Sequence, residues 1–288
     1  MNYSIPLVIP AAGLGSRLFP ATWAIPKELF PLGNKPALHY ILEEALYAGI
    51  TKTICITSKR KEALITYLTY KDEDNTIPLN NAEKNRLSSL NELNTAMSYF
   101  FTVQKKPHGV GNALLLAEKY IKNDSFFCMA YPDDIITDYS SGMNELMHIH
   151  KLHNCSVISI QEVPFNQVHS YGIIDATPIE KKNRLFNIKA IIEKPSIDKA
   201  PSCNAIVGRY ILDKKILSLI KKNPNNCFIT ALNTFLEQGN KVIGVALTSP
   251  RYDIGTIEGW LHAIHSINKT EERIPHSQKT SLHNISIA

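Results

Sequence analysis

The sequence has few of the features that mark membrane-spanning, secreted or repetitive proteins. Nowhere do about eighteen apolar residues follow one another, and no basic region precedes a long apolar stretch at the N-terminus. No internal repeat or low-complexity tract is present. The five cysteines lie far apart and are odd in number, which argues against a disulfide framework or a metal site. These absences predict a soluble, cytoplasmic protein whose thiols are reduced and mostly buried.

Neither sign of charge is in large excess. The formal net charge is +5 over 288 residues, and the basic residues form no Lys/Arg block. This mild excess argues against nucleic acid as a partner but suits small anionic ligands. A hydrophobic fraction of 44% in a chain of this length predicts one large globular domain.

Short apolar runs alternate with amphipathic segments along the first half of the chain. The runs lie at Leu7 to Pro10, Thr53 to Thr57, Phe100 to Val103, Phe126 to Ala130 and Ser156 to Ile160, and the amphipathic segments include Ala37 to Ala48 and Ala113 to Tyr120. This alternation predicts an α/β fold with a Rossmann-like mixed, mainly parallel sheet flanked by helices. In such sheets, ligands bind beyond the carboxyl ends of the strands.

The sequence pattern predicts one domain followed by a tail. A single domain is expected over 1–269, with a helical insertion at about 70–99 where the sequence becomes polar. Strand-like pieces and helices continue from Leu185 onward. Residues 270–288 lack a sustained period and are expected to form a flexible tail.

A glycine turn with two cations follows the first apolar run. Gly13 and Gly15 stand at the end of a predicted buried strand, where backbone N–H groups without an obstructing Cβ can turn toward an anion. Arg17 can hold two phosphate oxygens at once, and Lys27 adds a compact charge. The spacing is neither a dinucleotide fingerprint nor a Walker loop. A nucleoside triphosphate fits the cations, although the glycines alone fit a plain tight turn equally well.

The sequence resembles the bacterial UTP–glucose-1-phosphate uridylyltransferases of the sugar nucleotidyltransferase family. The motifs that carry the resemblance are, in chain order, Ala11 to Thr22, Ala24 to Glu28, Gln104 with Gly109-Val110-Gly111, Pro132-Asp133-Asp134, Tyr171-Gly172, Glu193-Lys194-Pro195, Asn204 to Tyr210 and Tyr252 to Gly255. The resemblance implies Mg²⁺-dependent uridylyl transfer from UTP to glucose 1-phosphate, giving UDP-glucose and pyrophosphate. It further implies a homo-oligomer, either a dimer or a tetramer, and no membrane partner.

Two aspartates are the candidate metal ligands. Asp133 follows the run Phe126 to Ala130, where a carboxylate can hold Mg²⁺ together with phosphate oxygens and water. Asp253 is the natural second ligand, and the resemblance assigns the metal to the same two residues. The alternative for any single aspartate at a strand end is a helix N-cap. Asp134 is expected to be a loop or capping residue.

The remaining site residues are assigned with the help of the resemblance. Arg17, Lys27 and Lys194 are expected to act in catalysis, with Lys27 on the triphosphate and Lys194 on the sugar phosphate. Gln104 can offer both a donor and an acceptor to the uracil edge, and a surface position is the alternative for it. The other nucleotide-binding candidates are Ala11, Ala12, Gly13, Gly15, Gly109 and Gly111, and the sugar-binding candidates are Tyr171, Gly172, Glu193, Val207 and Gly208.

Several positions depart from the family motifs. Asn112 stands where relatives usually carry His, and the segment Asn226 to Ala231 replaces a motif with acidic and amide side chains. Two alternatives therefore remain open. The enzyme could use another sugar phosphate or dTTP, or the chain could be a catalytically weak regulatory paralogue. The histidines His148, His150 and His153 are interpreted as solvated surface residues rather than a zinc site.

Overall fold

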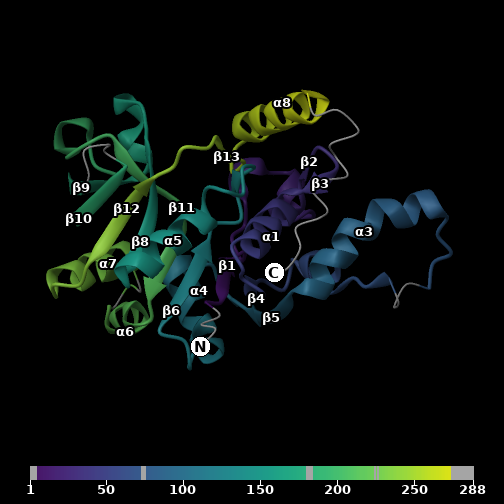
Figure 1. Cartoon of the computed structure of the whole chain (residues 1–288), viewed down its shortest axis with the longest axis horizontal. Coiled ribbons are helices and arrows are strands. Elements are labelled where there is room, and N and C mark those ends of the chain that lie inside the picture. Colours follow the sequence, from purple (N-terminus) through teal and green to yellow (C-terminus); the bar gives the residue numbers. More distant parts are fainter. Residues whose placement is uncertain (1–4, 73–75, 180–183, 224, 226, 274–288) are drawn as a thin grey trace.

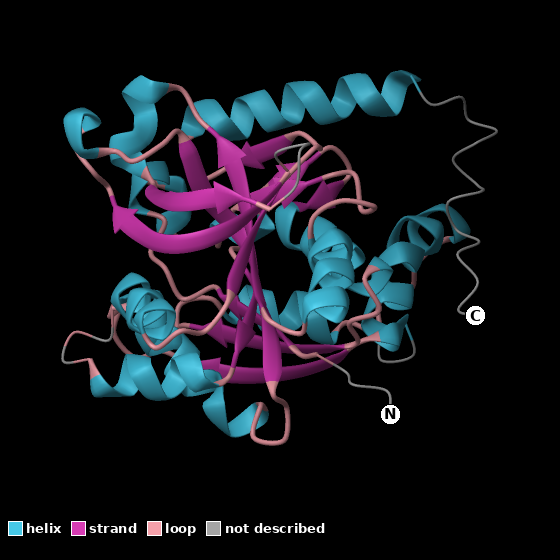
Figure 2. Cartoon of the chain, turned by 60° about the vertical axis from the view of Figure 1, so that its left-hand side comes forward, coloured by secondary structure: helices cyan, strands magenta, loops and turns pink. Residues whose placement is uncertain are grey.

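One twisted sheet forms the centre of the molecule, with helices on both sides of it (Figure 2). The computed structural model describes residues 5–72, 76–179, 184–223, 225 and 227–273, and from 270 on only the backbone. The main sheet has nine strands in the order β5-β4-β1-β6-β11-β8-β12-β10-β9. Its strands are β1 (Leu7–Pro10), β4 (Lys52–Thr57), β5 (Ser98–Val103), β6 (Phe126–Ala130), β8 (Ser156–Glu162), β9 (Gly172–Pro178), β10 (Leu185–Glu193), β11 (Asn204–Asp213) and β12 (Val242–Ala246).

The sheet is mixed, as predicted, but it is not mainly parallel, so only that part of the predicted fold class is wrong. Strands β5, β4, β1 and β6 run parallel to one another. Beyond β6, only the pair β8 and β12 is parallel, whereas β11, β10 and β9 all pair antiparallel with their neighbours. The physical reason is that β9 and β10 are joined by a short connection, which reverses the chain direction, whereas parallel neighbours need a long crossover. The prediction extended the alternation of the first half to the whole chain.

Alternating side chains of the strands enter two separate cores. Leu7 and Ile9 of β1 belong to one buried cluster, and Val8 between them belongs to the other, as the pleat of a strand requires. The first core also receives helices α1 (Ala37–Tyr47), α2 (Glu62–Thr69), α5 (Met143–His153) and α8 (Ile257–Arg273). The second receives α4 (Gly109–Ala117), α6 (Lys215–Lys222) and α7 (Phe228–Glu237). Because both faces are covered, the strands are apolar on both sides.

Helix α3 (Asn81–Ala96) forms the insertion and projects away from the sheet (Figure 1). It begins with a capping box in which the Asn80 side chain accepts from the Glu83 backbone N–H, and the Glu83 side chain accepts from that of Asn80. Its last turn is attached to the body, because Asn94 donates to the backbone oxygens of Tyr67 and Tyr70 at 2.9 and 3.0 Å. The insertion is therefore anchored at its C-terminal end, beside β5.

A second, two-stranded sheet carries the chain from the main sheet to α8. It pairs β7 (Asp134–Ile136) with β13 (Arg251–Asp253) antiparallel, with Asp253 opposite Asp134. A short hairpin of β2 (Pro31–Leu32) and β3 (Lys35–Pro36) precedes α1. The predicted tail from 270 begins inside α8, which continues to Arg273, and residues 274–288 lie outside the described part.

Among the described residues, no helix is long and apolar enough to cross a membrane. Cys55, Cys128 and Cys155 are buried, as their apolar surroundings predicted. His150 corrects the interpretation of the histidines, because only 8% of it is exposed. Its Nδ1 lies 2.8 Å from the Cys155 backbone oxygen, and its ring meets that of Phe126 edge to face.

Candidate active site

The carboxyl ends of the parallel strands bring the nucleotide-side candidates to one edge of the sheet. Ala11 follows β1, and its N–H donates to the Ile56 backbone oxygen in β4 at 2.8 Å. Gln104 follows β5, and its N–H donates to the Thr57 oxygen at 2.8 Å. Since neighbouring strands are about 4.8 Å apart, these two residues stand roughly 10 Å from each other. Both residues therefore stand at the same edge of the sheet, one on each side of β4.

The glycine turn has the backbone geometry that its sequence predicted. Gly15 has φ +66°, a left-handed conformation that residues with a Cβ rarely adopt. The Thr22 hydroxyl donates to the Gly15 oxygen at 2.8 Å and holds the turn closed. A Cβ on Gly13 would meet no atom within 4 Å. The two glycines therefore have different tasks, since Gly15 is required by the backbone and Gly13 is not.

A buried pair beneath this turn was not foreseen. Lys61 donates to both carboxylate oxygens of Glu28 and to the Ala11 backbone oxygen, at 2.8, 2.8 and 2.7 Å. Burial raises the pKa of Glu28 above its ordinary value and lowers the pKa of Lys61, against their mutual attraction. Because Glu28 is the neighbour of Lys27, this contact fixes Ala11, which precedes the glycine turn, and the Lys27 segment relative to each other. We call it the Lys61 clamp.

Asp133 and Asp253 meet in front of Gly255. A Cβ on Gly255 would lie 2.9 Å from Asp253 Oδ1 and 3.1 Å from Asp133 Oδ2, and 2.7 Å from Arg17 Nη2. A side chain at this position would therefore fill the space that the two carboxylates share. Lys27 donates to Asp133 Oδ2. Burial would raise the pKa of Asp133, but Lys27 and Arg17 outweigh it and hold the pKa below its ordinary value.

Asp134 has a structural contact of its own, which joins the two strands that carry the aspartates. Its Oδ1 accepts from Arg251 Nε at 2.5 Å, and its Oδ2 accepts from the Gly208 N–H at 2.7 Å. Burial would lower the pKa of Arg251, but the attraction to Asp134 raises it above its ordinary value. The carboxylate thus fixes the β7–β13 pairing and ties it to β11. It is neither a metal ligand nor a helix cap in this arrangement.

The sugar-side candidates gather where β9 and β10 pair. Glu193 lies opposite Gly172, and a Cβ on Gly172 would come within 3.3 Å of Glu193 Oε2. The Lys194 N–H donates to the Tyr171 oxygen at 2.9 Å. Lys194 has φ +48°, which is unusual for a residue with a side chain, and its side chain is 62% exposed. The Lys194 ammonium is therefore presented to solvent from a constrained backbone.

Val207 and Gly208 lie in β11 and connect the sugar side to the core. Val207 is buried, and its oxygen accepts from the Ser159 hydroxyl at 3.3 Å. Next to them, Arg209 forms an ion pair with Glu44 of α1 in which both side chains are almost completely buried. The Arg209 guanidinium donates to both Glu44 oxygens, at 2.7 to 3.1 Å. This pair joins strand β11 to helix α1.

The segment that replaces the family's acidic motif forms the start of α7. Phe228 and Ala231 point into the second core, and Asn226 lies outside the described residues. Asn233 of α7 binds the backbone of Ile191 in β10 with two hydrogen bonds of 2.8 Å. Helix α7 therefore supports the strand that ends in Glu193, and Phe228 to Ala231 at its start include no acidic or amide side chain.

Gln104 is buried, not on the surface, with 7% of it exposed. Its Nε2 donates to the Gly109 oxygen at 3.1 Å and to Asn112 Oδ1 at 3.0 Å. Gly109 has φ +81° and begins α4, and Gly111 is buried in its first turn. The amide therefore belongs to a fixed arrangement with the loop that precedes α4.

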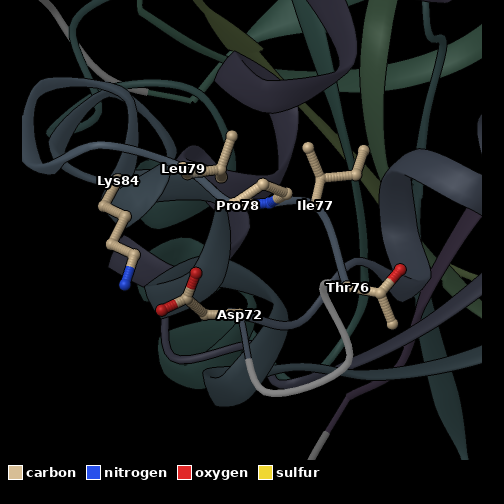
Figure 3. Close-up of a pocket in the computed structure, with 6 residues that line it drawn as sticks. All are labelled: Asp72, Thr76, Ile77, Pro78, Leu79 and Lys84. Atoms are coloured by element: carbon tan, nitrogen blue, oxygen red, sulfur yellow. The ribbon is translucent and has the colours of Figure 1, made fainter.

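An open hollow of about 290 Å³ lies elsewhere, on the insertion (Figure 3). It is lined by Asp72, Thr76, Ile77, Pro78, Leu79 and Lys84. Since none of the candidate site residues lines it, the hollow is separate from the arrangement described above.

Comparison with known proteins identifies the family of the chain. The family model described as nucleotidyl transferase matches residues 7–270. The chain belongs to the nucleotidyl transferase family. It is 34% identical over 270 residues to a UTP–glucose-1-phosphate uridylyltransferase of Mycoplasma pneumoniae, covering 92% of each chain. Among solved structures it resembles a UDP-glucose pyrophosphorylase complexed with UDP-glucose, with TM-score 0.82, 30% identity and coverage of 92% of this chain and 99% of the other. A UTP-bound enzyme from Acinetobacter baumannii gives TM-score 0.83, 26% identity and coverage of 98% and 99%.

Proposed function

We propose that the chain catalyses uridylyl transfer from UTP to glucose 1-phosphate, with release of UDP-glucose and pyrophosphate. The observation that carries this proposal is the meeting of Asp133, Asp253 and Arg17 around Gly255, beside Lys27. Two acids and two cations facing one space suit a polyphosphate and a divalent ion. The relatives carry the same activity in their names, and solved neighbours hold UTP or UDP-glucose.

The nucleotide occupies the edge formed by the parallel strands. The backbone of Ala11, Ala12, Gly13 and Gly15, together with Gly109 and Gly111, surrounds the base and the phosphates. Gln104 faces the base edge. Arg17 and Lys27 neutralise the triphosphate, so that negative charge developing on the departing pyrophosphate is stabilised.

The sugar phosphate occupies the edge formed by β9, β10 and β11. Glu193 accepts hydrogen bonds from sugar hydroxyls, and Gly172 lets the sugar approach the backbone beside Tyr171. The exposed ammonium of Lys194 binds the phosphate of the sugar and places its oxygen in line with the α-phosphorus of UTP. Val207 and Gly208 form the floor beneath it.

Asp133 and Asp253 fit Mg²⁺. The space between their oxygens is one that a single Cβ on Gly255 would fill, and the low pKa of Asp133 keeps its carboxylate ionised. Among the described residues no group of three or more metal-ligating side chains occurs, which fits an ion completed by substrate phosphates and water. Bound there, Mg²⁺ would supply charge neutralisation at the α-phosphate and pyrophosphate.

Another sugar phosphate or dTTP remains the alternative, because Phe228 to Ala231 at the start of α7 include no acidic or amide side chain where the family motif has them. We also infer a single catalytic domain over 1–269 with the insertion at about 70–99, a cytoplasmic location and a homo-oligomer. Pyrophosphate release across pairs of UTP or dTTP with several sugar phosphates separates the candidates. Highest kcat/KM with UTP and glucose 1-phosphate is the expected result.

Replacement of either aspartate tests the proposed site directly. Asp133→Ala and Asp253→Ala should each lower Mg²⁺-dependent pyrophosphate release by at least about a thousandfold, because the ion loses one of its two protein ligands. Asp175→Ala, on the exposed side of β9, is the matched control and should leave the rate unchanged. Normal activity of either site variant would exclude this metal site.

A further inference from the structure

The Gln104 amide can be oriented in only one way. Its nitrogen must face the Gly109 backbone oxygen, because a carbonyl accepts but cannot donate, and the two atoms are 3.1 Å apart. The same nitrogen lies 3.0 Å from Asn112 Oδ1. An amide nitrogen carries two protons, so these two contacts use both of them.

One polar atom of Gln104 is left for a ligand. Its Oε1 accepts no hydrogen bond from any residue in the described part of the chain. Asn112 lies in the first turn of α4, three residues after Gly109. The Gln104 side chain therefore offers a ligand an acceptor and no donor.

We propose that Asn112 is a specificity residue, which keeps Gln104 a pure acceptor and so selects a nucleobase with an N–H at its pairing edge. The inference rests on the proposed function, in which Gln104 faces the base. Uracil and thymine donate from N3, and Gln104 Oε1 can accept that proton. Cytosine presents an unprotonated N3 at the same place, so two lone pairs would oppose each other in a buried site.

Asn112 acts by removing the donor that cytosine would need. If its oxygen were absent, the second N–H of Gln104 could turn toward the ligand. An amide with a free N–H and a free C=O matches cytosine, donating to N3 and accepting from the exocyclic amino group. Discrimination between uracil and cytosine therefore depends on Gln104 together with the Asn112 oxygen that binds its amide nitrogen.

Two substitutions separate this role from packing. Asn112→Leu removes the acceptor at similar side-chain length, whereas Asn112→Asp keeps an oxygen acceptor in place. The dissociation constants of UTP, dTTP and CTP are measured by calorimetry with Mg²⁺ and without sugar phosphate, after thermal unfolding has shown that the variants fold. Asn91→Ala, in the exposed insertion, is the control.

For the wild type and Asn112→Asp, UTP should bind roughly ten- to a hundredfold more tightly than CTP, as expected when one buried polar contact is mismatched. In Asn112→Leu that ratio should fall at least about fivefold, while the ratio of UTP to dTTP stays constant because both bases share the N3–H edge. An unchanged ratio of UTP to CTP in Asn112→Leu would overturn the inference. So would a wild type that binds both nucleotides equally.

Binding without turnover keeps this test separate from that of the proposed function. A protein that prefers UTP but releases no pyrophosphate would contradict the proposed reaction and still decide the role of Asn112. Loss of the preference in both Asn112 variants would show that the side chain matters for packing only, and would also overturn the inference.

Discussion

The two halves of the sheet position ligand-binding groups in different ways. In the parallel half, β5, β4, β1 and β6 end at one edge, and the groups that would bind the nucleotide come from the loops beyond them. In the mixed half, Glu193 and Gly172 are themselves strand residues, placed opposite each other by the β9–β10 register. The first half depends on loop conformation, whereas the second depends on strand pairing.

This difference explains where the buried charges lie. The loop half needs a side chain to fix its loops, and the Lys61 clamp joins the backbone of Ala11 to the segment of Lys27. The mixed half needs its separate sheets to be held together, and Asp134 joins β7, β13 and β11. Buried ion pairs add little net stability but strongly penalise the loss of one partner. Both contacts are therefore sensitive places to test the comparison.

The largest effect should follow from breaking the Lys61 clamp. Lys61→Met leaves the Glu28 carboxylate buried without a partner and should lower the free energy of unfolding by about 3–5 kcal/mol, measured by urea denaturation. Burial raises the pKa of Glu28 in the folded protein. The free-energy cost of burying its ionised carboxylate therefore grows as the pH rises above the pKa that Glu28 has in the unfolded chain. The loss of unfolding free energy in Lys61→Met should therefore be smaller at pH 5 than at pH 7.5.

A double variant distinguishes the two consequences of the clamp. Glu28→Gln with Lys61→Met removes the unpaired charge and should recover most of the stability. The KM for UTP should still be about tenfold above that of the wild type, because the Ala11 oxygen has lost its contact with Lys61. Lys59→Met, on the exposed side of the same loop, is the control. If the double variant regained a normal KM, the clamp would matter for folding alone.

A smaller effect is expected from Asp134→Asn. An amide keeps the shape but gives Arg251 no charged partner, so the β7–β13 pairing holds Asp133 and Asp253 less firmly. The affinity for Mn²⁺ in the presence of UTP, measured by electron paramagnetic resonance, should fall roughly tenfold, about 1.4 kcal/mol. Asp175→Asn should bind the ion as the wild type does. Equal affinity in Asp134→Asn would show that the register does not depend on this carboxylate.

The smallest effect is expected from substitutions of Gly13 and Gly15 in the glycine turn, and the two should differ. Gly15→Ala forces a side chain into a left-handed backbone and should cost about 1–2 kcal/mol in thermal unfolding. In Gly13→Ala the added Cβ meets open space, so the free energy of unfolding should lie within about 0.5 kcal/mol of the wild-type value. A larger loss for Gly13→Ala than for Gly15→Ala would contradict the assignment of their tasks.

The sequence predicted the parallel half better than the mixed half. The runs Leu7 to Pro10 and Phe126 to Ala130 coincide with β1 and β6, because a strand buried on both faces is a continuous apolar run. Strand β9 was missed, since its outward residues are polar and the hairpin it forms has no strong turn signal. Which strands pair antiparallel could not follow from local pattern alone, because strand direction is decided by long-range pairing.

The candidate site residues stand in motifs, whereas the residues that contact and support them do not. Lys61 stands in the run Ser58 to Glu62, which is typical of an exposed loop, and only the fold shows that it turns inward to Glu28. Arg251 lies just before the Tyr252 to Gly255 motif and gave no signal of its own. Asn112 was noticed only as a departure. Such residues contact the site through other side chains, so their spacing in the chain carries no pattern.

The left-handed backbone of Lys194 has a consequence for the whole molecule. A residue with a Cβ is held in that region only if its neighbours over-determine it, and the strain costs on the order of 1–3 kcal/mol. A glycine there would relax the chain and make the protein harder to unfold, yet it would remove the ammonium that we propose binds the sugar phosphate. On this proposal, the backbone strain at Lys194 is the stability that the protein gives up to place that ammonium.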